Sequence, residues 1–285
     1  MLAAGLVATR FVHFSALLLL FGWSLHPLYA GGGAPRRPLA VLAALALVSG
    51  AAWFLLTAAA MAGSAAAAFD PATLSAVVRQ TDFGPLWLAR LAVIALSLAI
   101  VTAPMRTPRA AWAPMLAAGL ALASLAGTGH ARITGGALGA LHVASDAVHL
   151  LAAGAWLGGL AALIVATRAA FEAEFLRRFS GMGYVAVAAL VATGLVNSWF
   201  LVGAPSALVA SAYGRWLGLK LALFAAMAGL AALNRWRLTP TLAADPADAR
   251  ALAELRRNVI AEQLIGLAVV AVVSLLGTLA PPAVD

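Results

Sequence analysis

The chain has 285 residues, of which 64% are hydrophobic and only 10% are charged. A soluble domain is about 45–50% apolar and about 25% charged, so this excess of apolar side chains requires lipid as the surrounding solvent. The formal net charge is +8, and the arginines lie in short segments between apolar runs, which is typical of a membrane protein and excludes a nucleic-acid-binding face. The absence of cysteine excludes disulfides, thiolate metal sites and cysteine nucleophiles.

The apolar runs predict an all-α, polytopic membrane bundle that forms a single domain over residues 1–285. A spanning helix needs about 20 mostly apolar residues. Eight runs are candidates, and glycine- and proline-rich breaks separate them. They are residues 4–29, 38–62, 84–103, 111–129, 138–167, 179–202, 214–234 and 258–280.

The distribution of Arg and Lys predicts how the bundle is oriented. If the first loop is cytoplasmic, twelve of the 18 basic residues lie on the cytoplasmic side, so both termini are expected outside. Residues 70–82 begin with Asp70-Pro71 and are expected to form a short interfacial helix on the outer face. Residues 245–257 begin with Asp245-Pro246, a good N-cap and first-turn pair, and read as a cytoplasmic helix that leads into the last span. A solvated connector without a role of its own is the favoured interpretation of this segment.

The ionisable residues inside the predicted spans are the candidate functional groups, because polar side chains there are costly and usually face the bundle interior. Four of the five histidines fall in the outer half: His13, His130, His142 and His149. Imidazole is the commonest metal ligand and suits copper, zinc, iron and nickel, so these side chains alone do not select the metal. His26 lies near the cytoplasmic end, where a hydrogen bond between helices is the favoured role.

The fifth predicted span carries the densest group of polar residues. His142, Asp146 and His149 are at i, i+4 and i+7, so they share one helical face. The two histidines are about 10 Å apart along the axis, which does not suit chelation by both and suits two stations on a path or one site with an orienting partner. Asp146 could orient a histidine, pair with Lys220 or Arg90 at similar depth, or do both.

No phosphate-binding loop, nucleophile elbow or His-Glu-x-x-His zinc motif occurs in the sequence, so we expect no enzymatic activity. Glu262 lies near the cytoplasmic start of the last span, where it could pair with Arg256 or exchange a proton, and a structural role is favoured. Few polar residues below the outer histidines suit a path for a cation. The candidates are Tyr184, Asn234 and Glu262.

A series of short motifs occupies the second half of the chain. They are Gly129-His130-Ala131, His142 with Asp146 and His149, Trp156-Leu157-Gly158-Gly159, Arg178-Phe179-Ser180, Thr193-Gly194 with Asn197, Tyr213-Gly214 with Lys220, Asn234-Arg235, and Leu255-Arg256-Arg257 with Glu262. In this order and spacing, residues 125–281 resemble the copper resistance protein D (CopD) family, whereas the first three helices match it only in general character.

The resemblance implies a multi-pass protein of the bacterial inner membrane that takes part in copper homeostasis. The outer side, where the charge distribution puts both termini, is then the periplasm. It further implies copper transport from periplasm to cytoplasm, often beside a periplasmic copper-binding protein. The sequence lacks the methionine-rich segments that would supply thioether ligands to Cu(I). A histidine site that accepts Cu(I) or Cu(II) is therefore expected.

The leading hypothesis is a copper transporter or copper-binding membrane protein. Copper would enter at a site drawn from His13, His130, His142 and His149, with Asp146, Lys220 and Arg90 as orienting or charge partners. Two alternatives stay open. One is a b-type haem electron carrier, for which His13 and His149 are candidate axial ligands. The other is an assembly factor that delivers copper to a membrane oxidase and needs the site but no conduction path. The number of subunits and the copper valence are left open.

Overall fold

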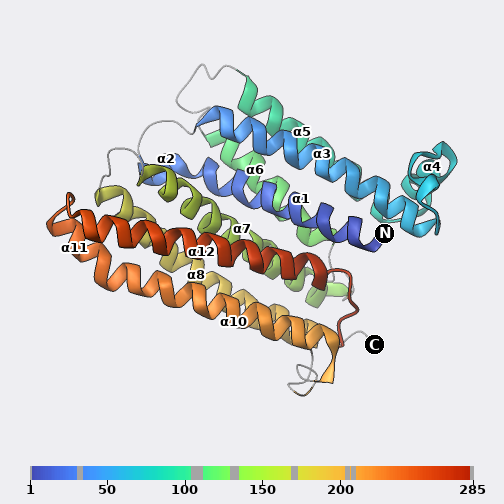
Figure 1. Cartoon of the computed structure of the whole chain (residues 1–285). Coiled ribbons are helices and arrows are strands. Elements are labelled where there is room, and N and C mark those ends of the chain that lie inside the picture. Colours follow the sequence, from blue (N-terminus) through green and yellow to red (C-terminus); the bar gives the residue numbers. More distant parts are fainter. Residues whose placement is uncertain are drawn as a thin grey trace.

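The chain folds into a bundle of long helices that run alongside one another (Figure 1). The structure is a computed structural model and describes residues 2–30, 35–103, 112–128, 135–167, 173–202, 206 and 210–282. All regular secondary structure in these ranges is helical. The predicted class, an all-α polytopic membrane bundle, is confirmed.

The long helices overlap seven of the predicted segments, with ends that differ by up to nine residues. They are α1 (Leu2–Ser24), α3 (Arg36–Met61), α5 (Phe83–Thr102), α7 (Gly136–Ala166), α8 (Ala173–Val202), α10 (Ala212–Leu233) and α12 (Ala249–Leu276). The shorter elements are α2 (His26–Ala30), η1 (Ala65–Phe69), α4 (Pro71–Gln80), α6 (Ala113–Ala123), η3 (Ser124–Thr128), η5 (Asn234–Leu238) and α11 (Thr239–Ala244).

Seven helical segments in the described ranges are long and apolar enough to cross a membrane. The predicted span at 111–129 corresponds to α6 and η3, where the apolar helical segment is shorter and covers Ala113–Gly127. Seven spans therefore have the required length, and the eighth stays a prediction.

The two helices predicted outside the spans both form. Asp70 caps α4 and accepts hydrogen bonds from the hydroxyl of Thr73 at 2.6 Å and from its backbone N–H at 2.8 Å, which lower the pKa of this exposed carboxyl. The second helix is continuous with α12, but the predicted cap at Asp245 is wrong. Asp248 is the N-cap instead, because its carboxylate accepts the backbone N–H groups of Arg250 and Ala251.

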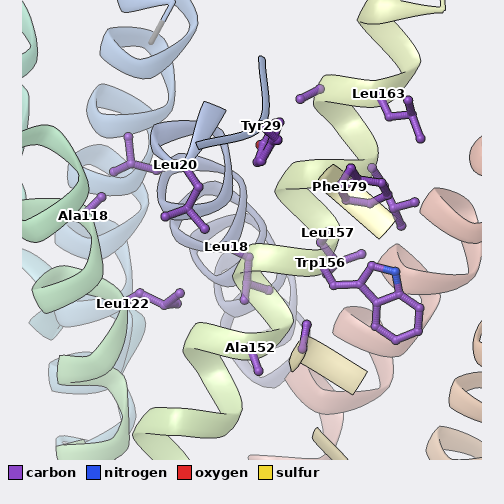
Figure 2. Close-up of a cluster of buried hydrophobic side chains, with 14 of the residues drawn as sticks. Leu18, Leu20, Tyr29, Ala118, Leu122, Ala152, Trp156, Leu157, Leu163 and Phe179 are labelled. Atoms are coloured by element: carbon purple, nitrogen blue, oxygen red, sulfur yellow. The ribbon is translucent and has the colours of Figure 1, made fainter. Parts of the chain in front are cut away.

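Helix α1 lies against α3, α6, α7 and α12. Its closest approach is to α7, where a Cβ atom added to Gly22 would lie 2.6 Å from Gly158 Cα and would overlap the carbonyl oxygen of Gly154. Figure 2 shows Leu18 beside α7 in this region, whereas Leu20 lies on the side of α1 that faces Ala118 of α6. Small residues at such a contact let two helix backbones approach closely, which favours association where lipid supplies no hydrophobic driving force between helices.

The start of α1 and the end of α12 lie at the same end of the bundle as α4, whereas α2 and α11 lie at the opposite end (Figure 1). We call these the α4 end and the α11 end. The predicted orientation puts the α4 end in the periplasm, and that assignment stays a prediction.

Candidate metal centre

Helices α7 and α8 pack side by side, and the polar face predicted on α7 is covered by α8. Three residues of α8 repeat the i, i+4, i+7 spacing of the α7 group and meet it in reverse order. The contacts join His149 to Thr193, Asp146 to Asn197, and His142 to Phe200. These α8 residues were not predicted as part of the site, although their matching spacing is a signal in the sequence that could have identified them.

The protonation of His149 follows from its hydrogen bonds. Its Nδ1 lies 2.9 Å from the Thr193 hydroxyl, and that hydroxyl donates its single hydrogen to the carbonyl oxygen of Ala189 at 2.5 Å. Nδ1 must therefore carry a hydrogen and donate it to Thr193. In the neutral imidazole Nε2 is then unprotonated, with a lone pair that is available to a metal ion.

Asp146 lies one helical turn from each histidine of α7. Its Oδ1 accepts a hydrogen bond from Asn197 Nδ2 at 3.2 Å. The cation whose charge acts on Asp146 is Lys220 of α10, and the same charge also acts on His149. Of the two partners predicted for Asp146, Lys220 is the one whose charge acts on it, although the two groups are not among the ion pairs of the described residues.

His142 is 2% exposed and lies two turns nearer the α4 end than His149. Its ring stacks on Phe200, with ring centroids 4.4 Å apart and ring planes at 11°. Its buried Nδ1 has no hydrogen-bond partner in the described part of the chain. A nitrogen in this state is a candidate ligand, because a buried polar atom without a partner is costly.

His13 lies in a different cluster, between α1, α3 and α5. Its Nδ1 donates to the Ala46 carbonyl oxygen at 3.0 Å, and its ring contacts Trp53 and Trp87. Arg90 lies over the Trp87 ring at 4.4 Å, and its charge acts on His13. The positive charge of this guanidinium would repel a metal ion bound at His13.

The predicted ligands are not all brought together. His13 contacts α3 and α5, whereas His142 and His149 contact α8. Within the described ranges no group of three or more His, Asp or Glu side chains could hold a metal ion. His130 lies outside the described residues. The pair His13 and His149, suggested for haem, points toward different neighbouring helices.

The remaining predicted polar residues lie toward the α11 end. Glu262 is 2% exposed and accepts a hydrogen bond from Asn234 Nδ2 at 2.5 Å. None of the ion pairs in the described part of the chain includes Glu262, so the suggested pair with Arg256 does not form. His26 contacts the rings of Tyr29 and Phe175, and its buried Nδ1 has no hydrogen-bond partner in the described part of the chain, so the predicted hydrogen bond between helices does not form at this nitrogen.

Comparison with known proteins identifies relatives along nearly the whole chain. The family description "Copper resistance protein D-like, N-terminal domain" matches residues 1–140, and "Copper resistance protein D" matches residues 173–276. The similarity therefore includes the first helices, which the sequence motifs alone did not distinguish. No solved structure matches the chain.

Three curated proteins are similar to this chain. "Copper resistance protein D" of Pseudomonas syringae pv. tomato is 34% identical over 96% of this chain and 96% of its own length. "Inner membrane protein YebZ" of Escherichia coli (strain K12) is 32% identical over 99% of this chain and 100% of its own length. "Copper transport protein CutJ" of Bacillus subtilis (strain 168) is 29% identical over 60% of this chain and 34% of its own length. With two full-length relatives above 30% identity and the membrane bundle described above, the chain belongs to the copper resistance protein D family.

Proposed function

We propose that this chain is a copper-binding protein of the inner membrane that accepts copper from the periplasm and passes it toward the cytoplasm. The observation that carries the proposal is His149, whose Nε2 is unprotonated and lies on the same face of α7 as Asp146. The names of the relatives support copper as the cargo and the inner membrane as the location. A periplasmic copper-binding protein would deliver the ion at the α4 end.

His142 is the first station in this proposal and His149 the second. They are two turns apart on α7, about 10 Å along the axis, so a single ion does not bind both at once. Imidazole nitrogens bind copper in either valence, and successive sites of moderate affinity allow an ion to move on. His130, outside the described residues, stays a predicted ligand near the same end. His13 stays a predicted ligand too, but the neighbouring Arg90 makes its pocket less favourable for a cation.

Asp146 and Lys220 balance each other before copper arrives. Burial of one charge without its partner is costly, so the two groups stabilise each other inside the bundle. A copper ion at His149 lies near the same carboxylate, and it therefore competes with Lys220 for Asp146. The lysine keeps the metal-free site neutral and limits the affinity of the metal-bound site.

Replacing Lys220 by methionine is expected to tighten copper binding by up to about tenfold, because a competing positive charge near the ion is removed. The affinity is measured by competition with a copper chelator of known strength. Arg215→Met is the matched control, since Arg215 is an exposed residue of the same helix and its loss is expected to leave the affinity unchanged. Weaker copper binding by the Lys220→Met variant would contradict the proposal that Lys220 and copper compete for Asp146.

Transport is tested by copper uptake into sealed vesicles that contain the purified protein. We expect uptake with the wild type and none above empty vesicles with His149→Ala. Copper binding without uptake in the wild type would instead favour the assembly factor, which holds copper for a membrane oxidase and does not conduct it. A haem absorption band in the purified protein would favour the electron carrier.

A further inference from the structure

A cavity of about 180 Å³ lies in the other half of the bundle, toward the α11 end. Residues of α7, α8, α10 and α12 line it, together with residues of η5 and α11. Most of its lining is apolar and includes Leu160, Val187 and Ala228. Glu262 and Asn234 are polar groups at its surface. The cavity therefore leads to a carboxyl group that is otherwise enclosed by the bundle.

Two neutral N–H donors act on the carboxyl group of Glu262. Asn234 Nδ2 donates to Oε1 at 2.5 Å, and the indole N–H of Trp156 on α7 is a second donor that stabilises the charged carboxylate. Asn258 Nδ2 in turn donates to Asn234 Oδ1 at 2.8 Å, which fixes the direction of the Asn234 amide. Figure 2 shows Trp156 projecting from α7 toward α12. The three side chains hold Glu262 in one orientation.

No cation is paired with Glu262 among the described residues. The titratable groups at the same cavity are Tyr184 of α8 and Arg235 of η5, and the Arg235 guanidinium lies over the Tyr184 ring at 5.4 Å. Helix α1 also packs on α12, but its Arg10 reaches Gly277 and Trp53, and its His13 faces α3. Helix α11 has no titratable side chain.

The surroundings of Glu262 thus favour its two protonation states by different means. Burial without a cation favours the neutral acid, whereas two N–H donors favour the carboxylate. When such preferences oppose each other, a carboxyl group can gain and lose a proton near neutral pH. The cavity supplies the route by which the proton leaves, since it extends from Glu262 to residues at the α11 end such as Trp236 and Thr239.

The backbone beside Glu262 is an independent sign of a specialised site. Asn234 begins η5, a π-helical turn in which the Thr239 N–H bonds to the Asn234 carbonyl oxygen. Such turns are rare and occur frequently at functional sites. This one places Asn234 inside the bundle at 7% exposure, while Trp236, two residues on, is 72% exposed.

From these contacts we propose that Glu262 is a proton-binding site, which takes up and releases a proton through the cavity at the α11 end. The site lies in the opposite half of the bundle from His142 and His149. The proton-binding proposal goes beyond the proposed copper function and does not depend on it. Either proposal can therefore be refuted while the other holds.

The test is the reaction of the whole protein, in lipid nanodiscs without copper, with N,N′-dicyclohexylcarbodiimide. This apolar reagent adds to a protonated carboxyl group, and the adduct rearranges to an N-acylurea that mass spectrometry assigns to a residue. We expect the labelling of Glu262 to fall as the pH rises between about pH 5 and about pH 9. Glu174, which is exposed and bound to Arg177 and Arg178, is the internal control and stays unlabelled at neutral pH.

Two variants assign the result to the hydrogen bonds described. Glu262→Gln is expected to lose the label at this position. Trp156→Phe removes one donor to the carboxylate, so the midpoint of labelling is expected to rise by about one pH unit. The wild-type titration decides the proposal even if Trp156→Phe does not fold. Labelling of Glu262 that is the same at every pH, or that is absent at every pH, would overturn it.

Discussion

Replacing His149 by alanine is expected to weaken copper binding by at least about 100-fold. The loss of a group that only supports a metal ligand costs about 10–100-fold in affinity, and removing the ligand itself costs no less. The measurement is the copper bound per purified protein, together with the affinity by chelator competition. His142→Ala is expected to weaken binding less if His149 alone holds the ion at the second station.

The hydrogen bond from His149 to Thr193 offers a finer variant of the same experiment. Thr193→Val keeps the shape of the side chain but removes the acceptor that fixes Nδ1–H, so a loss of about 10–100-fold is expected. His26→Ala is the control, because His26 lies in α2 at the α11 end, against Tyr29 and Phe175. Unchanged stoichiometry and affinity in both His142→Ala and His149→Ala would refute the site.

Replacing Gly22 by alanine is expected to destabilise the bundle by about 1–3 kcal/mol. The added methyl group would lie 2.6 Å from Gly158 Cα and would overlap the backbone oxygen of Gly154. Backbone atoms cannot turn aside as a flexible side chain can, so α1 and α7 must separate and lose their packing. The measurement is thermal unfolding of the purified protein in detergent, followed by circular dichroism.

A matched control for this variant is Gly229→Ala in α10. Nothing lies within 4 Å of a Cβ atom placed on Gly229, so the same chemical change meets open space there. Alanine also favours a helix relative to glycine, and the control is expected to be neutral or slightly stabilising. Equal loss of stability in the two variants would show that the close contact of Gly22 with α7 is not the cause of the destabilisation.

The positions of the helices were predictable because lipid imposes a minimum length on any apolar helix that crosses it. The spans of α3, α5 and α8 followed from this alone. The first residue of α12 could not be predicted in this way, because the sequence offers two acceptable N-cap residues, Asp245 and Asp248. Only the three-dimensional turn, in which Asp245 accepts the Ala247 N–H, leaves Asp248 to cap the helix.

The depth of the candidate histidines in the membrane was predictable from the sequence. The direction in which each side chain points was not. The rise of 1.5 Å per residue puts His13 and His149 in the outer half of the predicted bundle. Which neighbour each side chain faces depends on helix packing, and in an Ala- and Leu-rich helix the lipid face is as apolar as the buried face. His13 therefore turned out to face Trp53 and Trp87, while His149 faces Thr193.

The contact of Gly22 with Gly154 and Gly158 has a consequence for the order in which the chain assembles. During synthesis α1 is made first, but the helix that covers its glycine is α7, which begins only at Gly136. Helix α12, which also packs on α1, is the last to be made. The segment 1–140, which matches one family description, therefore contains α3 and α6 but lacks α12 and nearly all of α7, which also pack on its first helix. The border between the two matched regions divides the sequence, but the two halves complete their folding together.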